Sequence, residues 1–119
     1  MTAVISLTTI PDRINSIGAC IRSLASQGLP VYLWAVDKIA RSDTRLGDFP
    51  AFLDKYKVKV EVVPDYGPIT KLLPALRLVA DIIITADDDC LYGKGWAKGL
   101  LHWSEKLPKA ALGYMHSQQ

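Results

Sequence analysis

The fold is decided by the stretch Asp81-Ile82-Ile83-Ile84-Thr85-Ala86-Asp87-Asp88-Asp89. Its centre, residues 82–85, is a run of β-branched residues, and such a run is typical of a strand that is buried on both faces. Strands of this kind belong to parallel sheets whose two faces are covered by helices. The three aspartates are therefore expected at the C-terminal end of a buried strand, which is the edge where open α/β sheets bind their ligands.

On both sides of this strand, short apolar runs alternate with helical patterns, which indicates a βαβ arrangement and a mostly parallel sheet. We expect further strands at residues 4–7, 31–36 and 58–63, and a last short strand at residues 110–114. The strand at residues 58–63 alternates apolar residues with Lys59 and Glu61, which is typical of a sheet edge with one wet face.

Four helices are expected between these strands. The first covers residues 14–27 and is stopped by Gly28. The others are a short helix capped by Asp48 that carries Phe52, Leu53 and Tyr56, a helix at residues 70–79 with Pro74 in or near its first turn, and a helix at residues 96–107 ended by Pro108.

The pattern predicts one Rossmann-like α/β domain that covers all 119 residues, with helices on both faces of the sheet. A doubly wound strand order of 3-2-1-4 places the ends of the first and fourth strands side by side. Thr8 and Thr9 then face the aspartates, and Asp37 lies one strand further along.

The three adjacent carboxylates indicate a metal site. Two like charges about 4 Å apart repel by about 4 kcal/mol at an effective dielectric constant of about 20, and a divalent cation removes that cost. Carboxylate oxygens suit Mg²⁺ or Mn²⁺. A zinc cluster is not indicated, because His102 lies in a predicted helix and His116 near the end of the sequence. The alternative is an ordinary solvated acidic turn.

Other residues have both a functional and an ordinary interpretation. Lys71 follows the Gly67-Pro68 turn, at the start of an expected helix where phosphate can bind, although it can equally be a surface lysine. Arg13 begins the first helix, where the helix dipole disfavours a cation, so a ligand role is the alternative to simple exposure. We expect the three tryptophans Trp34, Trp96 and Trp103 in the core.

Composition excludes several classes of protein. The 14 basic and 12 acidic residues are scattered and give a net charge of +2, so nucleic acid is not an expected partner. No apolar run approaches the ~20 residues that span a bilayer, and the first residues resemble a strand, not a signal peptide. Cys20 and Cys90 make no disulfide framework, which predicts a reducing, cytoplasmic setting with Cys20 as inert packing.

Three segments resemble a group of small GT-A-fold glycosyltransferases of the family-2-like type. They are residues 4–14 (VISLTTIPDRI), residues 66–76 (YGPITKLLPAL) and residues 81–89 (DIIITADDD), followed by Trp96. The last segment resembles the DxD strand of these enzymes. The resemblance covers nearly the whole chain and is specific because the three segments occur together.

The resemblance implies a nucleotide-diphosphate-sugar donor, a UDP-sugar, bound together with Mn²⁺ or Mg²⁺. By position, the residues expected around the nucleoside and the diphosphate are Thr8, Thr9, Arg13, Asp37 and Lys71. In the DxD motif, Asp87 and Asp89 are expected to hold ribose and metal, with Asp88 between them.

The chain departs from this family at its C-terminal end, where members continue into an acceptor-binding half that carries the catalytic base. The acceptor is not indicated by the sequence, and the remaining candidate for the catalytic base is His116. Two functions therefore stay open: a glycosyltransferase, or a binding or scaffold module that has lost transfer. An aspartyl phosphatase is a weaker third alternative, because its motif sits on a first strand. The high apolar fraction of 50% predicts a homo-oligomer or a partner subunit.

Overall fold

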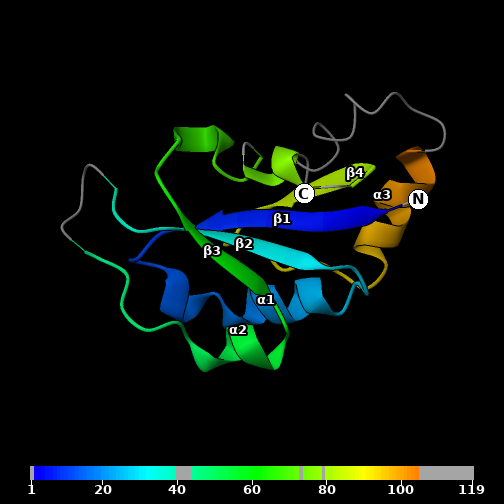
Figure 1. Cartoon of the computed structure of the whole chain (residues 1–119). Coiled ribbons are helices and arrows are strands. Elements are labelled where there is room, and N and C mark those ends of the chain that lie inside the picture. Colours follow the sequence, from blue (N-terminus) through cyan, green and yellow to red (C-terminus); the bar gives the residue numbers. More distant parts are fainter. Residues whose placement is uncertain (1, 40–43, 73, 79, 105–119) are drawn as a thin grey trace.

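The computed structural model describes residues 2–39, 44–72, 74–78 and 80–104. Its centre is a four-stranded sheet in which all neighbouring strands are parallel, in the order β3-β2-β1-β4 (Figure 1). The strands are β1 (Ala3–Thr9), β2 (Val31–Val36), β3 (Lys59–Val63) and β4 (Ile82–Ala86). The α/β class and the 3-2-1-4 order predicted from the sequence are confirmed.

The register of the sheet sets the position of the polar strand ends. Leu7 of β1 pairs with Ala86 of β4 on one side and with Leu33 of β2 on the other. The residues that follow Leu7 and Ala86 therefore emerge next to each other at the C-terminal edge. This pairing brings Thr9 into contact with Asp88 and places Thr8 in the same pocket as Asp87 and Asp88.

Helical segments cover the sheet on both faces (Figure 1). On one face lie α1 (Gly18–Ala25) and α2 (Ala51–Lys55), preceded by the 3-10 turn η1 (Ile14–Ser16). On the other face lie two 3-10 turns, η2 (Gly67–Ile69) and η3 (Pro74–Arg77). The last described helix, α3 (Trp96–Ser104), lies at the end of the sheet where the strands begin.

Each face of the sheet has its own apolar cluster. The larger cluster joins Ile5 and Leu33 to Ile21 and Leu24 of α1. The smaller one lies under η3 and consists of Trp34, Val36, Ile39, Val63 and Ala75. The sheet is thus buried from both sides, which is why its strands read as nearly continuous apolar runs.

The helix expected at residues 14–27 is shorter and interrupted. Residues 14–16 form a 3-10 turn, and the α-helix covers only Gly18–Ala25. The Ser16 hydroxyl donates to the carbonyl of Arg13 at 2.9 Å, and local bonds of this kind compete with helical hydrogen bonding. Gly28 adopts a φ of +79°, which fits its expected role after the helix, although the helix ends earlier, at Ala25.

The expected cap of the short helix is wrong. The N-cap of α2 is Pro50, which has a φ of −58° and a ψ of 143°, and no side chain caps the helix. Asp48 precedes this cap by two residues. Its carboxylate therefore does not hold the position from which a capping side chain reaches the first helical amides.

The α-helix expected at residues 70–79 is also wrong. The described residues of this segment form only the short 3-10 turn η3, with η2 just before it. Proline has no amide hydrogen, so Pro74 cannot donate to the carbonyl of Thr70 as an α-helix requires. A 3-10 turn that begins at Pro74 therefore replaces the α-helix.

The tryptophan prediction is correct only in part. Trp34 is buried at 4% exposure, whereas Trp103 on α3 is 49% exposed. The end of the predicted 96–107 helix, Pro108, the strand at 110–114 and His116 lie outside the described residues. Among the described helices, none has the length and apolar character needed to cross a membrane.

Candidate functional site

A pocket lies at the C-terminal edge of the sheet, where β1 and β4 end side by side. Its volume is about 280 Å³, and its described lining residues are Thr8, Arg13, Gly67, Lys71, Ala86, Asp87 and Asp88. The structure therefore brings together five of the residues singled out in the sequence. Larger cavities of about 620 Å³ and 420 Å³ lie beside α1 and α2 and beside β3, away from the aspartates. We place the site at the smaller pocket because the charged strand ends converge there.

Asp88 points inward and is buried at 7% exposure. Its Oδ2 accepts a hydrogen bond from the Thr9 hydroxyl at 2.8 Å and an ion-paired one from Nε of Arg13 at 3.0 Å. Thr9 is fully buried, so this carboxylate ties the end of β4 to the end of β1. The wall of the pocket at this point is thus stabilised by the contacts of Asp88 with Thr9 and Arg13.

Asp87 faces the pocket, and its carboxylate is paired with Lys71. The Lys71 ammonium donates to Oδ1 of Asp87 at 2.8 Å. The backbone of Asp87 is held from the α1 side: its amide donates to the Tyr92 hydroxyl at 2.8 Å, and its carbonyl accepts from Sγ of Cys20 at 3.3 Å. Lys71 therefore contacts Asp87 directly, and it does so from a turn and not from the start of an α-helix as expected.

The backbone of Lys71 is fixed to the sheet by Ser6, which the sequence patterns did not indicate, and through Ser6 by Trp34, which was expected only in the core. The Ser6 hydroxyl donates to the Lys71 carbonyl. The Ser6 oxygen in turn accepts a bond from the indole Nε1 of Trp34 at 2.7 Å. A serine inside the apolar run of β1 was the available signal, because a buried hydroxyl needs a hydrogen-bond partner.

Asp87, Asp89 and Cys90 form a potential metal centre. One ligand atom from each of the three lies within 4.8 Å of the other two. Asp89 is exposed, and the Cys90 thiol donates to its Oδ1 at 3.5 Å. Desolvation and the adjacent Asp89 carboxylate raise the pKa of the Cys90 thiol, and its sulfur is a soft ligand that does not suit Mg²⁺ or Mn²⁺. Two carboxylates remain, which fit a hard cation completed by phosphate and water.

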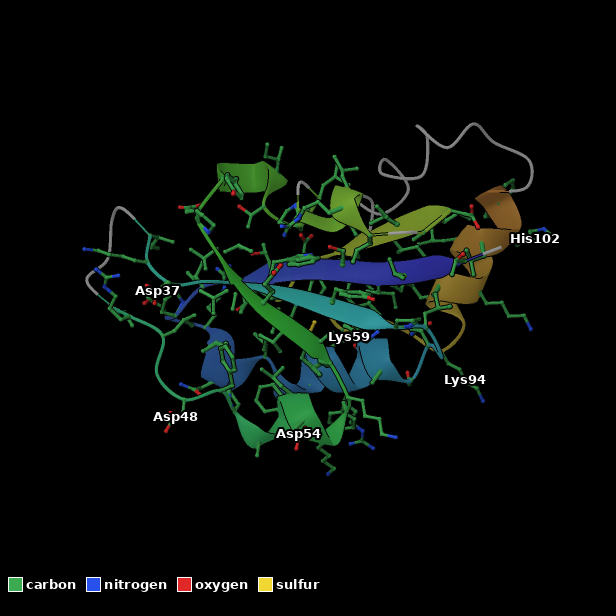
Figure 2. The ribbon with its side chains drawn as sticks, in the orientation of Figure 1. Asp37, Asp48, Asp54, Lys59, Lys94 and His102 are labelled. Carbon is green, nitrogen blue, oxygen red and sulfur yellow. The ribbon has the colours of Figure 1, made fainter. Side chains whose placement is uncertain are left out.

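Asp37 and Thr8 differ in how they relate to the pocket. Asp37, labelled in Figure 2, follows β2 and forms an exposed ion pair with Arg45 at 3.0 Å. It is not among the described residues that line the pocket. Thr8 does line it, while its hydroxyl donates to the carbonyl of Trp34 at 2.8 Å.

Two further residues, Tyr92 and Cys20, hold the backbone of Asp87 through hydrogen bonds. Burial raises the pKa of the Cys20 thiol to about 12, with Asp88 as a secondary cause, and burial also raises the pKa of Tyr92. Both groups are therefore neutral hydrogen-bonding partners at physiological pH, as expected for Cys20. Tyr92 was not anticipated. His102 lies on α3, at the opposite end of the sheet from Asp37 (Figure 2).

The fold and the site together define a Rossmann-like α/β domain with a pocket at its strand ends, where two aspartates are paired with an arginine and a lysine. No protein-family model matches the chain, and no curated protein is significantly similar to it. The function is therefore argued from the pocket itself.

Proposed function

We propose that this chain binds a nucleotide-diphosphate sugar, specifically a UDP-sugar, together with Mn²⁺ or Mg²⁺, as a GT-A-type glycosyltransferase does. The observation that carries the proposal is the arrangement at the junction of β1 and β4. There the Asp87 carboxylate is paired with the ammonium of Lys71, and a ligand atom of the exposed Asp89 lies within 4.8 Å of one of Asp87. This junction is the topological switch point of a 3-2-1-4 sheet, where such folds bind nucleotides.

The charges in the pocket suit a metal–diphosphate ligand. Asp87 and Asp89 supply hard oxygen atoms for the cation, with Asp89 the more exposed of the two. Lys71 and Arg13 supply positive charge on the pocket wall, where phosphate oxygens would lie. When bound, the metal ion would neutralise charge that develops on the departing nucleoside diphosphate.

Asp88 has a different role in this proposal. Its carboxylate already accepts bonds from Thr9 and Arg13. It therefore positions Arg13 and the end of β4 and leaves the outward faces of its two neighbours for the ligand. In this respect the middle acid of the motif differs from the metal ligands on either side.

A binding module without transfer activity is the second candidate. One observation favours it: among the described residues that line the pocket, the carboxylates are Asp87 and Asp88, and each is already paired with a cation. An inverting transferase needs a base within hydrogen-bond reach of the acceptor hydroxyl. Neither aspartate is available for that task while it holds its cation or a metal.

Hydrolysis of UDP-sugars in the presence of Mn²⁺ separates the two candidates, because water can replace the acceptor in an active site. A transferase releases UDP slowly, and Asp89→Ala abolishes that release. A binding module binds Mn²⁺ and UDP without releasing UDP from the sugar. Failure of the wild-type protein to bind any nucleoside diphosphate with Mn²⁺ would contradict both.

A further inference from the structure

The Lys71–Asp87 ion pair bears directly on how the proposed metal site fills. The Lys71 Nζ lies 2.8 Å from Oδ1 of Asp87, and Asp87 contributes a ligand atom to the Asp87–Asp89–Cys90 cluster. An ammonium group and a divalent cation repel each other strongly at such separations. A metal bound through Asp87 therefore competes with the ammonium of Lys71.

Lys71 is built so that its ammonium can leave while its backbone stays in place. The bond from Ser6 holds the Lys71 carbonyl against β1, and Trp34 holds Ser6. The side chain itself is 26% exposed and borders the pocket. Its flexible four-carbon stem allows the ammonium to turn from Asp87 towards the pocket without movement of the sheet.

The other ion pair of the site offers no such exchange. Asp88 is buried and is also bonded to the buried Thr9 hydroxyl, so removing Arg13 would leave a charge inside the protein. The Asp87 side chain, in contrast, is 47% exposed and has water or a metal ion available as a substitute partner. The exchangeable pair is therefore the one that involves Lys71.

We infer that Lys71 couples cation binding to diphosphate binding: its ammonium neutralises Asp87 in the unliganded protein and moves to the diphosphate when the metal ion takes its place. The inference rests on the proposed function and adds a specificity-determining role for Lys71. Metal alone binds weakly, because it must displace an ammonium group that already neutralises Asp87. Metal with UDP binds tightly, because the negative charge of the diphosphate attracts the displaced ammonium. The coupling is reciprocal, so Mn²⁺ increases the affinity for UDP by the same factor by which UDP increases the affinity for Mn²⁺.

The test measures Mn²⁺ affinity by isothermal titration calorimetry, with and without saturating UDP, in the wild type and in Lys71→Met. We expect Lys71→Met to bind Mn²⁺ alone about tenfold more tightly than the wild type, within the usual range of coupling between sites. UDP then increases the Mn²⁺ affinity of the variant about tenfold less than it does for the wild type. Part of the UDP effect remains, because UDP itself coordinates the metal.

Two further variants serve as controls. Lys94→Met removes an exposed lysine that lies far from the C-terminal edge (Figure 2), and it leaves both affinities unchanged. Lys71→Arg keeps a cation beside Asp87 and retains weak binding of Mn²⁺ alone. Thermal melting of each variant confirms that it is folded.

The outcomes distinguish this inference from the proposed function. If Lys71→Met binds Mn²⁺ no more tightly than the wild type while UDP binding persists, the coupling role is wrong and the donor site stands. If the wild type binds neither Mn²⁺ nor UDP, the proposed function is wrong, and the inference is wrong with it.

Discussion

At the scale of single residues, the three aspartates divide into two kinds. Asp88 is buried and bonded to Thr9 and Arg13, whereas Asp87 and Asp89 point outward. Alternation along a strand does not account for that division, because β4 ends at Ala86 and both Asp88 and Asp89 lie in a turn. The convergence of Asp88 with Thr9, in contrast, followed from the strand order. The hydrogen bonds that join Trp34 to Ser6 and Ser6 to Lys71 could not be predicted in this way, because they depend on the path of the loop before β4.

The bracing role of Asp88 leads to a stability prediction. Asp88→Ala removes the acceptor of a fully buried threonine hydroxyl and the partner of Arg13. We expect the free energy of unfolding to fall by about 1–3 kcal/mol, the cost of leaving a buried polar group without a partner. Urea unfolding monitored by tryptophan fluorescence measures it. Asp89→Ala is the matched control and should preserve or raise stability, because it relieves repulsion between neighbouring carboxylates. Equal losses in the two variants would contradict the division.

The buried Cys20 thiol predicts a fall in stability at alkaline pH. In the unfolded chain the thiol ionises near its ordinary pKa of 9.0, whereas in the folded protein burial raises that pKa to about 12. The unfolded state then binds fewer protons between these values, so the stability present below pH 9 is lost as pH rises towards 12. One such group changes the unfolding free energy by at most about 1.4 kcal/mol per pH unit. Urea unfolding at several pH values should show a smaller slope for Cys20→Ala. If stability falls with pH equally steeply in the wild type and in Cys20→Ala, Cys20 is not a source of the alkaline loss of stability.

At the scale of elements, sequence patterns predicted strands better than helices. The expected strand at 31–36 matches β2 (Val31–Val36), and the 82–85 run lies within β4. Buried strands are defined by their apolar content, which a sequence displays directly. The helical segments were misjudged where local chemistry prevailed, at Ser16, Pro50 and Pro74. A hydrophobic period does not reveal these side-chain bonds and missing amide donors.

The η2 turn is the element that presents Lys71, and Thr70 holds it together. Thr70 is buried at 1% exposure; its hydroxyl donates to the Gly67 carbonyl at 2.8 Å and accepts from the Tyr66 amide at 3.0 Å. Thr70→Val keeps the shape of the side chain and removes both bonds. We expect a loss of about 1–3 kcal/mol in the free energy of unfolding, together with weaker UDP binding.

Chemical denaturation and UDP titration measure the two effects of Thr70→Val. Ser26→Ala is the matched control, because it removes an exposed hydroxyl bond to the carbonyl of Ser23 and should change stability by less than about 0.5 kcal/mol. A Thr70→Val protein as stable as Ser26→Ala, with unchanged UDP affinity, would show that the turn does not depend on Thr70.

At the scale of the whole molecule, several large apolar side chains are exposed. Three of them lie in η2, in η3 or between these turns: Ile69, Leu72 and Leu76, with 53%, 40% and 61% of their surface accessible. Exposed apolar side chains favour contact between copies of the chain, so we predict that the protein self-associates. Light scattering at micromolar concentration should show a dimer or a larger species. A monomer at every concentration tested would contradict it.

The central claim is that Asp87 and Asp89 bind a cation together with a nucleoside diphosphate, and thermal melting tests it most directly. A ligand that binds only the folded state stabilises it by about 2.7 kcal/mol at a hundredfold excess over its dissociation constant. We predict that Mn²⁺ with UDP raises the melting temperature of the wild type, whereas Asp89→Ala melts at an equal or higher temperature without ligand and loses the shift. A wild-type protein whose melting temperature does not change with Mn²⁺ and any nucleoside diphosphate would contradict the claim.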